Sequence, residues 1–177
     1  NNSELVGISF SFKPGEAFFV ILPENYQECL DIVKEFKPFL EDEKIFKIGQ
    51  NIKYDLAILK WYETEVKGKL FDTMLAHYLI EPDMRHNMDL LAETYLNYKT
   101  IHIDQLIGKK GKGQLSMRSV DPQLISDYAC EDADITYRLY EKFEPMLEEG
   151  GLQPLFDEIE IPLVPVLAAM ESEGVKL

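Results

Sequence analysis

The sequence predicts an α/β fold, and two patterns carry that prediction. Near the start, residues 4–12 alternate between apolar and polar side chains, and residues 17–22 form a second apolar run. The turn signal Lys13-Pro14-Gly15-Glu16 separates the two runs, so we expect them to pair as a hairpin. Further along, short strand-like runs alternate with segments whose apolar residues recur at helical spacing, which is typical of the α/β class.

The first elements after the hairpin follow from the same signals. Residues 27–40 carry apolar side chains three and four positions apart, which predicts a helix. A short strand is expected at 44–48 and a helix at 53–63. Another short strand at 69–71 leads to Asp72, whose carboxylate can cap a helix that runs to residue 80.

The second half of the chain is expected to be mainly helical. Residues 88–96 form a helix, and residues 97–120 are the loosest part of the chain. Asp121-Pro122 is a strong helix start, and the long helix should be kinked or ended at Pro145, before the stop signal Gly150-Gly151. A final apolar helix over 159–173 should pack against another surface.

Composition leaves the partner open. The 177 residues carry a net charge of −14 and a pI near 4.6, and clustered Lys and Arg normally bind nucleic acid. A carboxylate site that holds Mg²⁺ can nevertheless attract phosphate through the ion. The sequence shows no signal peptide and no membrane-length apolar run, and Cys29 and Cys130 lack metal-ligand spacing. We therefore expect a cytoplasmic protein with reduced thiols and no membrane association.

Two pairs of polar residues suggest chemistry. Asn51 and Asp55 are four positions apart at the start of a predicted helix, and Tyr128 and Asp132 have the same spacing on the long helix. Each aspartate lies beside an apolar stripe. An alternative for each is a partly exposed helical aspartate without function. Two inward carboxylates, each with a polar partner one turn earlier, indicate a site for Mg²⁺ or Mn²⁺, which prefer oxygen ligands.

These pairs belong to a series of blocks that resembles the exonuclease domain of family A DNA polymerases, a branch of the DEDD exonuclease superfamily. The blocks occur in the family's order over nearly the whole chain: Leu5-Val6-Gly7-Ile8-Ser9-Phe10, Gly49 to Asp55, Phe71-Asp72-Thr73-Met74-Leu75, Met88-Asp89-Leu90-Leu91-Ala92-Glu93, Tyr128 to Asp134 and Ile161 to Leu167.

The resemblance implies a fold, a reaction and roles. The fold would be ribonuclease H-like, a mixed sheet flanked by helices, and the reaction would be hydrolysis of 3′-terminal nucleotides of DNA for proofreading. Two divalent ions, Mg²⁺ or Mn²⁺, would be held by Asp132 directly and by Asp55 largely through water. Tyr128 would position the nucleophile, and Gln50 and Asn51 would contact the terminal nucleotide of a single-stranded 3′ end.

One departure from the family matters. The family's first motif, an Asp-x-Glu on the opening strand of the sheet, lies upstream of the segment that matches Leu5 onward. We therefore expect the sheet to lack its first strand and the chain alone to be nearly inactive, and whether it binds either ion stays open. The broken sheet could take up a strand from a neighbouring copy, close onto the strand near residues 45–48, or stay associated with upstream residues.

The resemblance also suggests boundaries and partners. Residues 1–158 would form the truncated exonuclease domain, and residues 159–177 would lead into a polymerase domain of the same parent chain. A non-catalytic module that supports the polymerase or holds single-stranded DNA is the alternative function. An RNA-trimming member of the same superfamily is a third, which the polymerase-like end of the sequence disfavours.

A few single residues complete the predictions. The basic cluster in the glycine-rich loop either contacts the DNA backbone or is simply solvated. Arg85 would lie near the bound strand, with a surface role as the alternative. We expect the three histidines to be structural or exposed, and Tyr54 and Trp61 to be buried in the core. The loop cluster consists of Lys109, Lys110, Lys112 and Arg118.

Overall fold

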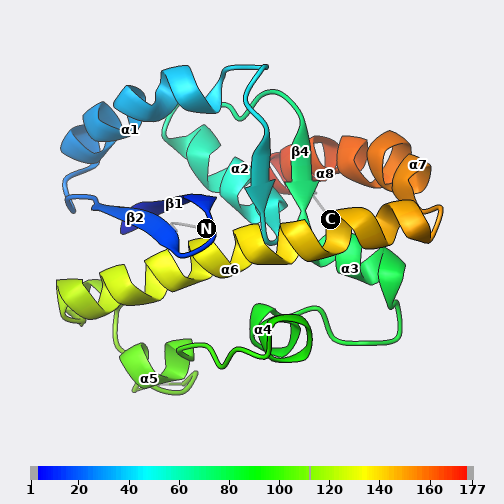
Figure 1. Ribbon diagram of the computed structural model, residues 1–177. Helices are drawn as coiled ribbons and strands as arrows, with labels where there is room; N and C mark the ends of the chain where they lie inside the picture. Colours follow the sequence, from blue (N-terminus) through cyan, green and yellow to red (C-terminus); the bar gives the residue numbers. More distant parts are fainter. Residues whose placement is uncertain (1–3, 112, 175–177) are drawn as a thin grey trace.

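The computed structural model describes residues 4–111 and 113–174, and Lys112 therefore lies outside the described residues. Its strands form two separate two-stranded sheets, with helices packed around both (Figure 1). The expected α/β character is present, but the described residues do not form the single mixed sheet that we expected, and most of the fold is helical. The strands are β1 (Gly7–Lys13), β2 (Glu16–Ile21), β3 (Lys47–Gly49) and β4 (Leu70–Asp72).

The first sheet is the predicted hairpin. Strands β1 and β2 are antiparallel, with Ile8 opposite Val20 and Phe10 opposite Phe18. Gly15 has a φ of 77° in the connecting turn, a conformation that glycine adopts without steric cost. The second sheet pairs β3 and β4 in parallel, with Ile48 opposite Phe71. Within the described residues the hairpin does not pair with β3, so direct closure of the broken sheet, one of the three arrangements considered, does not occur.

The helix α1 (Tyr26–Leu40) covers the hairpin. Asn25 caps it by accepting a hydrogen bond from the Glu28 N–H at 3.1 Å. Its buried side chains, Leu30 and Val33 among them, share a core cluster with Leu22 at the end of the hairpin and with Tyr62 beyond α2 (Ile52–Trp61). This cluster holds the hairpin, α1 and the end of α2 together as one packed layer.

The longest helix, α6 (Pro122–Glu149), runs beneath both sheets and packs against each of them (Figure 1). Its side chains Ile135, Leu139, Phe143 and Leu147 recur every four residues and are fully buried. They form the main core with Phe71 of β4 and with two further helices. These helices are α3 (Thr73–Ile80) and α4 (Met88–Leu96).

We predicted that Pro145 would either end or kink the long helix. The helix does not end there, because it continues past Pro145. Proline removes one backbone hydrogen bond and costs about 3 kcal/mol in a helix interior. Phe143 and Leu147 flank it and are fully buried, and burial of such side chains contributes about 1.5–3 kcal/mol each. The packing outweighs the proline, and the helix ends at Glu149, before the predicted stop at Gly150.

The final elements wrap back onto the second sheet. After α7 (Gln153–Leu155) and a π turn (Phe156–Glu160), the helix α8 (Ile161–Glu173) packs against α2. Val164 and Ala168 are buried there, and Lys53 forms a salt bridge with Glu171 at 2.6 Å. The proposed boundary at 158/159 falls inside the π turn.

The loosest stretch contains two short elements, α5 (Ile103–Ile107) and a 3-10 turn (Met117–Ser119). Across the described part of the chain, no helix is long and apolar enough to cross a membrane.

Candidate functional site

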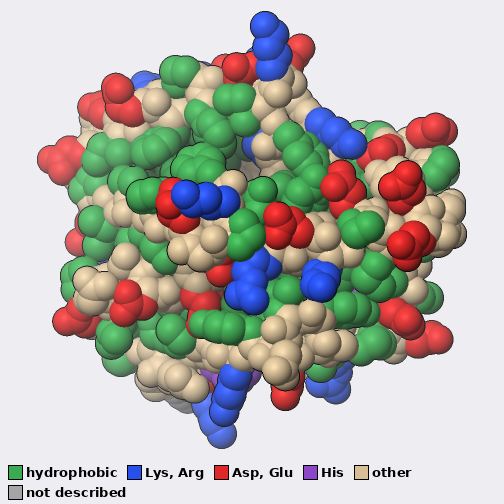
Figure 2. All heavy atoms as spheres, viewed as in Figure 1, with side chains coloured by type: hydrophobic (Ala, Val, Ile, Leu, Met, Phe, Trp, Pro, Cys, Tyr) green, Lys and Arg blue, Asp and Glu red, His purple; other side chains and the backbone are tan. Residues whose placement is uncertain are grey.

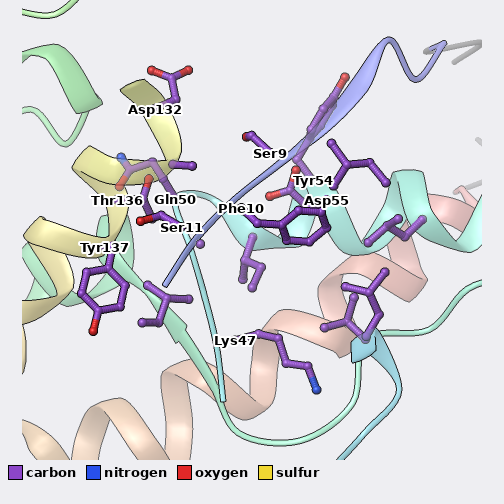
Figure 3. Close-up of a pocket in the computed structure, with 18 of the residues that line it drawn as sticks. Ser9, Phe10, Ser11, Lys47, Gln50, Tyr54, Asp55, Asp132, Thr136 and Tyr137 are labelled. Atoms are coloured by element: carbon purple, nitrogen blue, oxygen red, sulfur yellow. The ribbon is translucent and has the colours of Figure 1, made fainter. Parts of the chain in front are cut away.

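A cavity of about 720 Å³ separates the two sheets. It lies between β1 and β3, and we call it the β1–β3 cavity (Figure 3). Residues of α2 and α6 complete its walls, and Asp55 and Asp132 come from these two helices. The fold thus brings two carboxylates that are far apart in the sequence to the wall of one cavity.

Asp55 occupies the first turn of α2. Its side chain is exposed to solvent through the cavity, although protein atoms enclose it on most sides. This enclosure raises the pKa of the Asp55 carboxyl, and the nearby Asp72 carboxylate raises it further. In the described residues no salt bridge neutralises Asp55, so its charge is available to a cation.

Asp72 sets the position of Asp55, and sequence reasoning found only half of its role. The side chain caps α3, as predicted, by accepting from the N–H groups of Met74 (2.8 Å) and Leu75 (3.3 Å). It also accepts from the N–H groups of Asn51 (3.1 Å) and Ile52 (2.8 Å) at the start of α2. One carboxylate therefore caps two helices, and burial raises its pKa while the four N–H donors oppose that rise.

The expectation that Asn51 and Asp55 share a helical face is wrong. Helix α2 begins at Ile52, and Asn51 has a left-handed backbone with a φ of 56°. The helix begins there because Asp72 binds the first free N–H groups. Asn51 therefore lies in the turn before the helix, where helical periodicity does not apply.

Tyr128 and Asp132 behave as the spacing predicted. They lie one turn apart on α6. Burial raises the pKa of Asp132 to about 6, with the Tyr128 side chain acting in the opposite direction and Glu131 and Asp89 adding to the rise. Burial and the carboxylate raise the pKa of Tyr128, which keeps its hydroxyl protonated at neutral pH.

Gln50 joins the cavity to a buried histidine network that no sequence pattern indicated. Its Nε2 donates to the carbonyl oxygen of His86 at 2.9 Å, and its Oε1 accepts from the Thr73 hydroxyl. His86 Nδ1 lies 2.7 Å from Nδ1 of the fully buried His77, whose Nε2 is 3.0 Å from the Tyr95 hydroxyl. The histidines are structural here, and they fix the segment that contains Arg85.

The basic residues separate into two groups. Lys109, Lys110 and Arg85 are exposed. Arg118 instead donates to the carbonyl oxygens of Leu5, Leu22 and Pro23 and pairs with Glu4 at 2.5 Å. Its guanidinium therefore holds together the two backbone segments at the open end of the hairpin. The sequence did not reveal this role. On the face shown in Figure 2, basic side chains are interspersed with acidic ones rather than gathered into one patch.

The residues present fit a divalent cation in part. Two carboxylates that form no salt bridge in the described residues line the same cavity, and oxygen ligands suit Mg²⁺ or Mn²⁺. Within residues 4–111 and 113–174, however, no group of three or more His, Cys, Asp or Glu side chains is arranged to hold a metal.

Two predictions about exposure are wrong. Tyr54 and Trp61 are 55% and 60% exposed rather than buried. Leu124, near the start of α6, is 54% exposed. Two acidic side chains of the same helix have partners: Glu131 accepts from the Tyr98 hydroxyl, and Asp134 accepts from the Gly15 N–H.

Comparison with solved structures shows the fold. The chain superposes on Brucella melitensis NrnC with a TM-score of 0.71 at 22% identity, over 90% of this chain and 72% of that one. A structure of that protein with bound Mg²⁺ gives a TM-score of 0.68. The polymerase domain of Pol1 from M. smegmatis gives 0.68 at 19% identity, over 92% of this chain and 24% of that one. The chain therefore shares the ribonuclease H-like fold of these structures.

Sequence comparison then gives the family. A family model described as 3′–5′ exonuclease matches residues 1–148. DNA polymerase I of Pseudomonas aeruginosa is 40% identical over 97% of this chain, and that of Borreliella burgdorferi is 35% identical over 99%. The chain belongs to the 3′–5′ exonuclease family related to DNA polymerase I. It spans about a fifth of the length of these curated relatives.

Proposed function

We propose that the intact domain hydrolyses 3′-terminal nucleotides of single-stranded DNA by two-metal-ion catalysis, in the service of proofreading. One observation carries the proposal: Asp55 and Asp132, from distant parts of a chain of the 3′–5′ exonuclease family, open onto one cavity without basic partners. Mg²⁺ or Mn²⁺ held there would supply an activated water and stabilise the leaving 3′ oxygen.

The residues of this chain would bind the ions and the DNA end and would orient the attacking water. Asp132 would hold one ion and Asp55 the other, and the Tyr128 hydroxyl, one turn before Asp132 on α6, would orient the attacking water. Gln50 and Asn51, at the start of α2, would contact the terminal nucleotide. Arg85, Lys109, Lys110 and Lys112 would contact the strand behind it, whereas the internal bonds of Arg118 favour a structural role.

The test adds the segment that precedes the matched region in a relative. The chain is fused to the roughly 20 residues that precede the matched region in the Pseudomonas aeruginosa polymerase, which is long enough for one strand and its connection. Mg²⁺-dependent release of nucleotides from a 3′-labelled strand should rise about a thousandfold over the unfused chain. Asp132→Asn in the fusion should abolish the gain. Equal rates with and without the fusion, or an active Asp132→Asn fusion, would contradict the proposal.

The second candidate is a non-catalytic module that holds single-stranded DNA or supports the polymerase. The exposed lysines of the loop favour the first form, because they could bind phosphate without metal. The apolar face of α8 favours the second. Measured DNA affinity that is unaffected by Mg²⁺, together with no hydrolysis by the fusion, would select this function. The exposed side chains of the α8 face are Leu163, Val166, Leu167 and Met170.

A further inference from the structure

We infer that His77 is a positioning residue for the Gln50 amide, and that it acts through His86. The contact between the two imidazoles fixes the backbone of residues 81–87, and the His86 carbonyl in that segment then fixes the amide of Gln50. The effect on Gln50 does not depend on nuclease activity. Its consequence for DNA deepens the proposed function and rests on it.

The segment of residues 81–87 connects α3 to α4 and contains no helix or strand. Backbone bonds at its two ends continue α3 and begin α4. In the described part of the chain, its other hydrogen bonds to neighbouring elements come from His86. The imidazole Nδ1 lies 2.7 Å from His77 Nδ1, and the carbonyl oxygen accepts from Gln50 at 2.9 Å. The position of His86 therefore depends on these two contacts.

His77 is the fixed end of this arrangement, because it is fully buried on α3. Its ring packs against Phe143, with 5.4 Å between the ring centroids, and its Nε2 lies 3.0 Å from the Tyr95 hydroxyl. Two Nδ1 atoms at 2.7 Å form a hydrogen bond when one imidazole donates and the other accepts. The core thus holds His77, and His77 holds His86.

The orientation of the Gln50 amide follows from its two partners. Nε2 can only donate and faces the His86 carbonyl, while Oε1 can only accept and faces the Thr73 hydroxyl. A half-turn of the amide would place its oxygen against the His86 carbonyl oxygen, so that two acceptors would face each other. The bond to His86 uses one of the two N–H groups of Nε2. Because Gln50 lines the β1–β3 cavity, the second N–H is left as a donor for a ligand there.

For the proposed function, this arrangement determines what Gln50 offers to the DNA end. A fixed N–H donor suits an acceptor oxygen of the terminal nucleotide, and it adds no charge to the cavity that Asp55 lines. If residues 81–87 shift, Nε2 loses its partner and the amide is free to rotate. Arg85 precedes His86 in the same segment and would shift with it. One contact in the core therefore controls two predicted DNA contacts.

Two substitutions of His77 separate the roles of its two nitrogens. The polar atoms of asparagine lie two bonds from Cβ, as Nδ1 does in histidine, and those of glutamine lie three bonds away, as Nε2 does. His77→Asn therefore keeps a partner for His86 and loses the bond to Tyr95, whereas His77→Gln keeps the Tyr95 bond and loses the contact with His86. Both variants remove a ring from the core, so each controls for the structural effect of the other.

The first measurement follows the Gln50 side-chain amide by NMR without DNA. Exchange of its Nε2 protons with solvent should be about fivefold faster in His77→Gln than in the unmodified chain, and nearly unchanged in His77→Asn. Equal changes in the two variants, or no change in either, would overturn the inference. If His77→Gln does not fold, the coupling between the two Nδ1 nuclei across their hydrogen bond is measured in the unmodified chain. Its presence would support the inference, and its absence would overturn it.

The second measurement is the affinity for a single-stranded oligodeoxythymidine. It should fall about fivefold in His77→Gln and in Gln50→Ala, and the double variant should bind no more weakly than Gln50→Ala alone. Additive losses would overturn the inference, because His77 would then act on DNA by another route. If no variant differs in affinity, or none binds, while the amide measurement gives the expected result, the proposed function fails and the positioning of Gln50 by His77 stands.

Discussion

At the scale of single residues, Asp72 has the widest structural effect. It is 1% exposed, and its two oxygens accept hydrogen bonds from backbone N–H groups at the starts of both α2 and α3. Oδ2 accepts from Ile52, while Oδ1 accepts from Asn51, Met74 and Leu75. Because α2 carries Asp55, the geometry of the β1–β3 cavity depends on a residue that does not line it.

Asp72→Asn tests this double cap. The variant keeps one carbonyl oxygen but places an NH₂ group against an N–H donor, which leaves buried groups unsatisfied. The free energy of unfolding from urea titration should fall by about 1–3 kcal/mol. Asp121→Asn is the control, because Asp121 caps only α6 and asparagine caps a single helix almost equally well. Equal losses in the two variants would show that the second cap contributes nothing.

His77 predicts a pH dependence. Burial lowers the pKa of its imidazole, and His86 lowers it further; Tyr95 and Phe143 also face the ring. The unfolded chain therefore binds a proton more tightly than the folded one. Stability should be complete above about pH 6.5 and fall as the pH drops below it, by at most about 1.4 kcal/mol per pH unit from this group.

The measurement compares urea unfolding at neutral and mildly acidic pH. His77→Gln should flatten the acid loss even if it lowers stability overall. His102→Gln should retain the loss, because His102 is about half exposed and pairs with Asp89 at 2.9 Å. An unchanged slope in His77→Gln would assign the acid sensitivity to other groups.

At the residue level, Asp55 and Asp132, which the sequence singled out, both line the β1–β3 cavity, and Tyr128 lies one turn before Asp132 on α6; their catalytic roles stay predictions. Prediction failed for Tyr54 and Trp61, since helical spacing shows which residues share a face but not what covers that face. The roles of Arg118 and Asp72 depend on backbone groups that are distant in sequence, and no local pattern records such partners.

At the scale of elements, α6 contains the clearest conflict between local preference and packing. Pro145 interrupts its backbone hydrogen bonds, yet the helix continues to Glu149 because Phe143 and Leu147 are buried on either side. Local preference and tertiary packing oppose each other here, and packing decides the outcome.

Pro145→Ala should therefore stabilise the protein. Alanine restores the missing N–H donor and removes the clash with the preceding turn, so the free energy of unfolding should rise by about 1–3 kcal/mol. Pro122→Ala, at the first turn of the same helix, should change little, because its N–H has no helical partner in any case. A loss of stability in Pro145→Ala would indicate that the main core requires the distortion caused by proline.

Elements whose ends carry clear turn, capping or stop signals were predicted to within a few residues. The hairpin turn, the Asp72 cap, the Asp121-Pro122 start and the glycine stop each marked a boundary that the structure has. The pairing of strands was predicted less well, because it depends on which strands are neighbours in space. For the same reason, the sequence did not predict that the two sheets would stay separate in the described residues. We had expected the gap between them to be filled or closed.

At the scale of the whole molecule, the two sheets share no backbone bond within the described residues, and α6 packs against both. The hairpin layer and the main core are therefore joined by side-chain packing. We expect native-state hydrogen exchange of the Ile8 and Phe10 amides to report a lower opening free energy than the amides of Leu139 and Phe143. Equal opening free energies at both places would show that packing alone makes the molecule unfold as one unit.

The contact between the hairpin and α6 also has a consequence during synthesis. Strand β1 ends at Lys13, and the helix on which it rests begins at Pro122, more than a hundred positions later. At about 5–20 residues per second, the hairpin leaves the ribosome roughly 5 to 20 s before its support exists. During that interval the phenylalanines of the hairpin, Phe10, Phe12, Phe18 and Phe19, have only each other and α1 to cover them, so the nascent chain offers a ready site for a chaperone that binds exposed apolar segments.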